Sequence, residues 1–273
     1  MPDLISLLPF VLVLCAVGAF AGVLAGLLGI GGGIVLVPAF FYVFSEMGFE
    51  TASLMQVCVA TSLATIIVTS ARSAQSHRKK GSLDMSILKP FAPGLALGAI
   101  VGVFVVQGLE SRVLQGLFGV FGAVIAMWLI FGREEWRLAE SFPQGIARPV
   151  MGFGVGGLST LLGIGGGNIG VPLMTLYGVP ILRAVGTSAG FGLIIALPSV
   201  LGFLFVDAGE GAPPLTFGLV NLPAFLVVVA MTLITTPMGV WLAHKLPARP
   251  LRIVFAVSIC IAALNMGLRA IAG

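Results

Sequence analysis

Charged residues are scarce in this sequence. Aspartate, glutamate, lysine and arginine together make up 9% of its 273 residues, whereas soluble domains contain about 25%. Hydrophobic residues reach 58%, and uncharged stretches of the length that crosses a hydrocarbon core, about 20 residues, recur along nearly the whole chain. This composition excludes a soluble globular domain and predicts an integral membrane protein.

The alternating pattern of an outer-membrane barrel is also missing. Such barrels need strands of about ten residues in which apolar and polar side chains alternate. Here the apolar runs are continuous and rich in leucine, alanine, glycine and valine, which is typical of membrane helices. Residues 1–5 contain no basic residue, so we expect the first apolar run to stay in the protein and not to act as a cleaved signal peptide.

Several chemical motifs are absent as well. The three cysteines, Cys15, Cys58 and Cys260, have no CxxC or Cys/His spacing, so we expect hydrophobic packing from them and neither a metal site nor a disulfide framework. HExxH and paired intramembrane aspartates do not occur, and no GxSxG nucleophile elbow at a strand-to-helix turn is expected, which argues against an enzyme. No cofactor is expected, and the coupling ion, proton or sodium, stays open.

The predicted fold is therefore an all-α membrane protein with about eight transmembrane helices and two broken or re-entrant segments at glycine motifs. The expected spans are residues 4–28, 52–70, 90–107, 113–131, 184–205, 217–243 and 251–268, with a short eighth at 150–162.

A glycine motif occurs twice in the chain. Residues 27–38 read LLGIGGGIVLVP, and residues 161–172 read LLGIGGGNIGVP. We interpret the chain as one transport domain built from two repeats, residues 1–132 and 149–273, joined by a cytoplasmic linker at 133–148.

The basic residues favour one of two topologies for these repeats. If each motif segment crosses the membrane once, the fourteen lysines and arginines divide nine to five between the two sides. If each segment turns back at its glycines, the repeats are inverted and the division is twelve to two, with only Arg112 and Arg269 outside. The inverted topology predicts a multi-pass protein of a bacterial inner membrane with basic loops in the cytoplasm and both termini in the periplasm. It also explains the pI near 9.3 without nucleic acid as a partner.

Three consecutive glycines are expensive inside an apolar helix. Each costs about 1 kcal/mol relative to alanine, so we expect both helices to break at the motif and new short helices to begin at Ile34 and Asn168. The first N–H groups of such helices lack partners and carry the positive end of the helix dipole. Two of these ends facing each other near the midplane form an anion site without lysine or arginine. The predicted backbone ligands are Gly31, Gly32, Gly33, Ile34, Gly165, Gly166 and Gly167.

Polar side chains inside the spans add candidates. Asn168 is positioned to donate its amide to an anion, although capping its own helix is an equal alternative. The pairs Thr61–Ser62 and Thr187–Ser188 follow the two motifs and are further site candidates, although such hydroxyls often bond only the preceding turn of their own helix. Other polar residues are expected to pack helices more than to bind a ligand: Gln56, Ser159, Thr160, Asn221, Thr235 and Thr236.

Two further groups of residues receive structural interpretations. Glycines spaced four apart, at Gly18, Gly22 and Gly26 and in the pairs Gly98/Gly102 and Gly152/Gly156, predict close helix packing. His77 and His244 are expected to be solvated in basic inner loops. No aspartate or glutamate lies in the middle of a span, which argues against a carboxylate relay like those of cation pumps.

The duplicated GxGGGxxxxP segments, each early in its half and followed by Thr-Ser, resemble the sulfite exporter TauE/SafE family, also called the 4-toluene sulfonate uptake permease family. The resemblance covers nearly the whole chain. It implies transport of sulfite, sulfonates such as sulfoacetate, or related small organic anions in either direction. It also implies site roles for the two glycine triplets and Asn168.

Residues and resemblance together predict a carrier of small sulfur-containing anions that works by alternating access between the inverted halves. An anion-selective channel and a carrier of a non-sulfur carboxylate are the alternatives. The expected partners are the anion and the lipid bilayer, and a homo-oligomer is left open.

Overall fold

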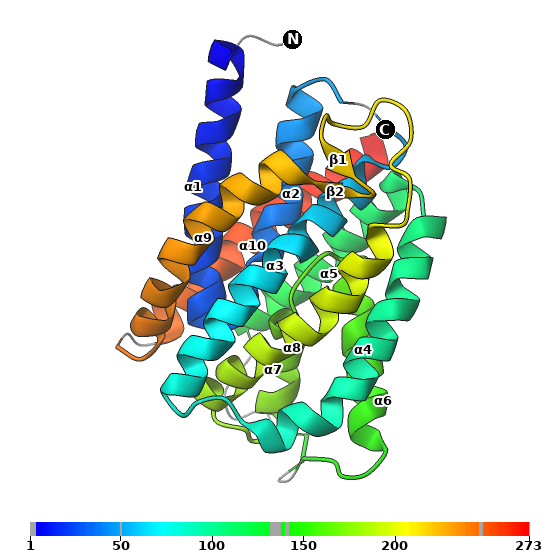
Figure 1. Ribbon diagram of the computed structural model, residues 1–273. Helices are drawn as coiled ribbons and strands as arrows, with labels where there is room; N and C mark the ends of the chain where they lie inside the picture. The colour runs from blue at the N-terminus through cyan, green and yellow to red at the C-terminus, as the bar shows by residue number, and fades with distance from the viewer. Residues whose placement is uncertain (1–3, 50, 132–137, 140–141, 246–247, 273) are drawn as a thin grey trace.

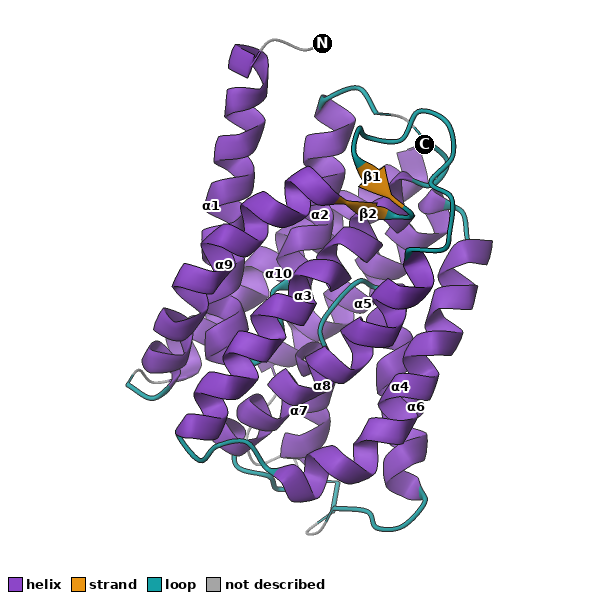
Figure 2. Ribbon diagram, in the orientation of Figure 1, coloured by secondary structure: helices purple, strands orange, loops and turns teal. Residues whose placement is uncertain are grey.

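The structure is a computed structural model that describes residues 4–49, 51–131, 138–139, 142–245 and 248–272. Within these residues the chain forms a helical bundle with one small hairpin (Figures 1 and 2). The elements are α1 (Leu4–Leu28), α2 (Gly33–Glu46), α3 (Leu54–Lys79), α4 (Met85–Gly108), α5 (Ser111–Phe131), α6 (Ala147–Leu161), α7 (Gly167–Leu176), α8 (Ile181–Phe203), β1 (Thr216–Phe217), β2 (Val220–Asn221), α9 (Leu222–Ala243) and α10 (Ala248–Ala272).

Six helices of the described chain are long and apolar enough to cross a membrane: α1, α3, α4, α5, α8 and α9. Two further apolar segments, Gly33–Glu46 and Ile259–Ile271, are shorter. The helices agree with the predicted all-α membrane fold, while the predicted number of eight transmembrane helices stays a prediction.

Three predicted boundaries were wrong by five residues or more. The span expected to begin at residue 90 begins at Met85, because the Asp84 side chain caps α4. The span expected to end at residue 70 continues as α3 to Lys79, because the side of α3 that faces the protein still carries buried groups, Ser73 and His77. The span expected to begin at residue 217 begins at Leu222. The residues before it form the antiparallel hairpin β1–β2, which turns at Gly218 with φ +55°.

Part of the predicted linker at 133–148, including Arg133 and Arg137, lies outside the described residues.

Helices α3 and α8 form the centre of the bundle. In their membrane-spanning windows 83% and 72% of residues are buried, against 28–44% for the other four long helices. The two central helices run antiparallel and touch where the Ser70 side chain of α3 lies against Gly192 of α8. The hydrophobic core therefore lies around α3 and α8, and it includes the buried residues of α2, among them Phe40 and Phe44.

Glycine stripes bring two pairs of outer helices into backbone contact. Helix α1 runs parallel to α9, and a Cβ atom on Gly22 would overlap Thr235, while one on Gly26 would overlap the carbonyl oxygen of Thr236. Helix α4 runs parallel to α6, and a Cβ on Gly98 would overlap the carbonyl of Phe153. The predicted packing role of these glycines is confirmed.

Candidate anion site at the two glycine turns

The first glycine motif is a turn between two helices. Helix α1 ends at Leu28 and α2 begins at Gly33. Between them Gly29, Gly31 and Gly32 have φ values of +66°, +73° and +80°, a backbone conformation that side chains other than glycine rarely adopt. The predicted break of this helix is confirmed, and its glycines are required by the turn itself.

The second motif also breaks its helix. Helix α6 ends at Leu161 and α7 begins at Gly167. Only Gly163 has a left-handed φ, at +63°, so the backbone conformation does not require glycine at positions 165, 166 and 167. Glycine is needed there because neighbouring atoms leave no room for a side chain.

The two turns touch each other directly through their backbones. A Cβ on Gly33 would overlap the carbonyl oxygen of Gly163, and a Cβ on Gly167 would overlap that of Gly29. Gly165 lies in the same way against the carbonyl of Ile30. Residues 29–33 and 163–167 are all buried. The structure thus brings together two elements that lie 134 residues apart in the sequence and encloses them in protein.

Two serines form hydrogen bonds to these turns, and each serine bonds the turn of the other half of the chain. The hydroxyl of Ser62 on α3 donates to the carbonyl oxygen of Gly163 over 2.8 Å. The hydroxyl of Ser188 on α8 lies 3.3 Å from the carbonyl oxygen of Gly29 and also donates to Val185 at 2.9 Å. Both predicted serines therefore lie at the glycine turns.

The two predicted threonines lie elsewhere. Thr61 accepts a hydrogen bond from the backbone N–H of Asn221, the N-cap residue of α9. Thr187 accepts one from the backbone N–H of Asp84, the N-cap residue of α4. Both hydroxyls are bound to helix ends and not to the glycine turns.

Asn168 stands in the first turn of α7, and its side chain is 3% exposed. Neither its Nδ2 nor its Oδ1 atom has a hydrogen-bond partner. The alternative role as a cap is not seen, because α7 has no side-chain cap. A buried amide without partners costs about 1–3 kcal/mol, so a hydrogen-bonding partner from outside the chain would relieve this cost.

Ser70 is a residue that the sequence analysis missed. Its side chain is 1% exposed, its hydroxyl has no partner, and it lies against Gly31 and Gly192. The neighbouring Thr69 donates to the carbonyl oxygen of Gly31 at 3.2 Å. Ser159 and Thr236 also have buried hydroxyls without partners.

The remaining predicted backbone ligands lie in the same buried region. Gly32 contacts Ala21 of α1, Gly166 contacts Phe191 of α8, and the Ile34 side chain is 1% exposed.

Formal charge is absent from the buried part of the described chain, since no lysine, arginine, aspartate or glutamate there is buried. The only described salt bridge joins Arg183 Nε to Asp84 Oδ2 at 3.5 Å, at the ends of α8 and α4. The hydrogen bond from Ser86 and the nearby Arg183 guanidinium lower the pKa of Asp84. Positive potential at the glycine turns therefore has to come from N–H groups and helix ends.

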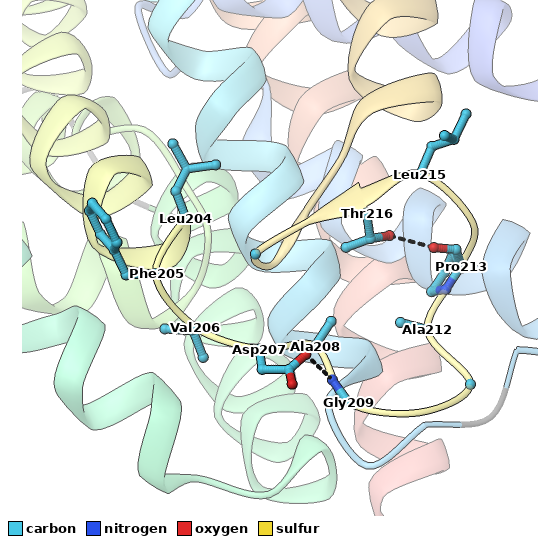
Figure 3. A pocket seen from close by; sticks show the side chains of 12 residues that line it. Leu204, Phe205, Val206, Asp207, Ala208, Gly209, Ala212, Pro213, Leu215 and Thr216 are labelled. Carbon is cyan, nitrogen blue, oxygen red and sulfur yellow. Dashed lines mark hydrogen bonds between the residues drawn. The ribbon is translucent and has the colours of Figure 1, made fainter.

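A hollow of about 490 Å³ lies under the loop 204–218 between α8 and α9 (Figure 3). Its lining includes Asp207, whose carboxylate accepts from the backbone N–H of Gly209 at 3.0 Å, and no basic residue. An adjoining hollow of about 460 Å³ carries Glu110 and Glu210. These acidic hollows do not suit an anion.

Comparison with known proteins places this architecture among membrane transporters. The family model described as Sulfite exporter TauE/SafE matches residues 14–266. A protein of Haemophilus influenzae named "Probable membrane transporter protein" is 31% identical over 263 residues, which cover 95% of this chain and 99% of that protein. "Probable membrane transporter protein MJ0441" of Methanocaldococcus jannaschii is 26% identical over 261 residues, 93% of each chain. No solved structure matches the chain significantly.

The apolar helices and the family match define an integral membrane protein of a transporter family. The chain belongs to the sulfite exporter TauE/SafE family, as the glycine motifs predicted.

Proposed function

We propose that this protein carries small oxyanions across a membrane and holds them where the two glycine turns meet. Sulfur-containing anions, such as sulfite and the sulfonates, are the first candidates. The proposal rests on one observation above all: the buried Asn168 amide, in the first turn of α7, has no partner for either of its polar atoms.

The chemistry of the surrounding groups supports an anion. The helix starts of α2 and α7 carry the positive end of the dipole, although the N–H groups of Val35 and Asn168 already donate to the carbonyl oxygens of Gly32 and Gly165. The Ser70 hydroxyl beside Gly31 is a further free donor. A sulfite or sulfonate group offers three oxygens that accept several such bonds at once. A metal cation would instead need carboxylates, of which none is buried in the described residues.

The family description adds the sulfur chemistry. Sulfite is the substrate that this description names, and the relatives' names specify transport without a substrate. We extend that description to this chain as the first substrate class to test.

The mode of transport follows from the burial of the turns. Since residues 29–33 and 163–167 are buried, an anion reaches them only after helices move. This is the behaviour of an alternating-access carrier and not of an open anion channel.

We further propose that the two repeats are inverted in the membrane. Helix α1 is parallel to α9 and α6 is parallel to α4, while the central helices α3 and α8 are antiparallel. Arg112 and Arg269 lie at one end of the bundle, and most described basic residues lie at the other end: Arg72, Arg78, Lys79, Lys80, Lys89, Arg148, Arg183 and Lys245. The positive-inside rule assigns this end to the cytoplasm, so both termini would lie in the periplasm.

A thermal-shift screen tests the binding site. Purified full-length protein is heated with sulfite, thiosulfate, sulfoacetate, isethionate, taurine and simple carboxylates, because a ligand at 100 times its Kd stabilises the fold by about 2.7 kcal/mol. Asn168→Ala should lose most of this stabilisation and keep its expression level. Thr175→Val is the matched control, since Thr175 lies on the same helix and bonds only within it.

The outcomes separate the alternatives. Stabilisation by a sulfur anion that depends on Asn168 supports the proposal. Stabilisation by carboxylates alone would change the substrate class, and equal shifts in the wild type and Asn168→Ala would move the site away from α7.

A further inference from the structure

His77 is a buried acid–base group near the end of a central helix. The sequence predicts a solvated loop for it, which was wrong: its side chain is 0% exposed and belongs to the last turn of α3. Among the described residues it is the only buried Asp, Glu, His, Lys or Arg. Ionisable groups in membrane helices are rare and are most often functional.

His77 is the last of three polar residues on one face of α3 that bond the end of α1 or the glycine turn that follows it. Thr69 donates to the carbonyl of Gly31, and Ser73 donates to that of Ala25 at 3.2 Å. His77 Nε2 lies 3.0 Å from the carbonyl oxygen of Gly26. Gly26 belongs to the last turn of α1 before the break. The imidazole is therefore connected to the turn where we propose that the anion binds.

The hydrogen bonds around His77 fit two protonation states. Because a carbonyl only accepts, Nε2 must carry a proton in both states. In the neutral ring, Nδ1 accepts from the Ser82 hydroxyl at 2.9 Å. In the charged ring, Nδ1–H donates to Ser82, whose hydroxyl turns to the carbonyl oxygen of His77 at 3.1 Å. Rotation of one hydroxyl therefore accommodates the gain or loss of a proton.

The ionisable groups around His77 are basic. They therefore favour protonation of the imidazole only when a negative charge is bound nearby. His244 follows the end of α9, and its ring centroid lies 5.9 Å from that of His77. The positive charge of Lys80, the C-cap residue of α3, repels a proton on the His77 ring. Helix α1 and the loop before α4 contribute only the Gly26 carbonyl and the Ser82 hydroxyl. No carboxylate among the described residues is paired with the ring.

We propose that His77 is a proton-binding site that couples proton movement to anion transport. This inference rests on the proposed anion site, because an anion at the glycine turns supplies the negative charge that the surroundings of His77 lack. Binding free energies are reciprocal, so the anion strengthens proton binding and the proton strengthens anion binding by the same factor. The protein then moves the anion and a proton in the same direction.

The chain contains only two histidines, which makes a direct titration possible. In His244→Gln protein labelled with ¹⁵N-histidine, the remaining imidazole signal comes from His77. Its titration is recorded with and without saturating sulfite, or whichever anion the thermal-shift screen identifies. We expect the anion to raise the proton affinity of His77 at least tenfold. A midpoint that stays in place while the anion binds would overturn the coupling and leave the anion site intact.

Flux measurements provide the second test. In proteoliposomes with a pH gradient, His77→Gln should exchange labelled anion at equal pH but lose gradient-driven accumulation, while His244→Gln keeps both. Accumulation that persists in His77→Gln would contradict the proposal. If no anion binds or moves in the wild type, the proposed function itself fails, which is a different result from either histidine outcome.

Discussion

The hydroxyl of Thr61, in the first half of the chain, accepts a 2.9 Å hydrogen bond from the backbone N–H of Asn221 in the second half. Thr187 holds Asp84 in the same way at 3.0 Å. Each threonine therefore anchors the N-cap residue of a helix that belongs to the other half. The serine beside each threonine bonds a glycine turn of the other half, so each Thr-Ser pair connects the two halves twice.

The anchoring role predicts that Thr61→Val lowers stability without changing anion affinity. The substitution leaves the buried N–H of Asn221 unpaired, which costs about 1–3 kcal/mol. Thermal unfolding in detergent and anion titration of the same sample measure the two effects. A drop in affinity at unchanged stability would show that Thr61 belongs to the binding site after all.

The serines should differ from each other. Ser62→Ala removes a 2.8 Å bond to Gly163 and should cost about 1 kcal/mol. Ser188→Ala removes a longer contact to Gly29 from a hydroxyl that also serves its own helix, so its effect should be smaller. Unfolding temperatures of the two variants give the order, and a larger loss in Ser188→Ala would reverse this interpretation.

Two glycine substitutions should have opposite effects. In Gly167→Ala the new methyl group meets the backbone of Gly29 and Ile30, and such overpacking costs about 1–3 kcal/mol. In Gly154→Ala the methyl group has no neighbour within 4 Å, and alanine favours the helix by about 1 kcal/mol. Equal stability of the two proteins would contradict the backbone contact between the turns.

Asp84 predicts a pH-dependent contribution to stability. Its pKa is lowered in the folded protein, chiefly by Ser86 and in part by Arg183. The carboxylate therefore stabilises the fold above its ordinary pKa, and this stabilisation is lost as the pH falls through the lowered value. Asp84→Asn, which keeps an acceptor for the N-cap, should be slightly less stable than the wild type at pH 7. The difference should vanish in acid, and a difference that persists at low pH would point to the cap instead.

The sequence predicted the glycine turns well because their signal is local. A run of three glycines disfavours a helix whatever surrounds it, and two copies at a constant spacing favour a two-fold repeat. The contact between Gly33 and Gly163 was expected in outline, since helix ends that bind one anion must face each other. The hydrogen bonds of Ser62 and Ser188 to the opposite turn were not predictable, because they depend on how α3 and α8 cross.

Ser70 and His77 could not be recognised for a related reason. Both follow an apolar run and precede or lie in a basic segment, a pattern typical of a helix end in water. Their burial comes from α1 and α8, which pack against that side of α3. The hairpin before α9 was missed because its apolar residues run on towards the helix, although Asn221, whose side chain caps α9, and Pro223 in its first turn mark where the helix begins.

The parallel contacts of α1 with α9 and of α6 with α4 have a mechanical consequence. The paired backbones are in direct contact at Gly22 and Gly98. We therefore expect each helix pair to move as one rigid piece. Each piece contains one helix from the beginning of one repeat and one from the later part of the other. The proposed moving parts therefore do not coincide with the two predicted repeats, and a cross-link between α1 and α9 should leave transport intact.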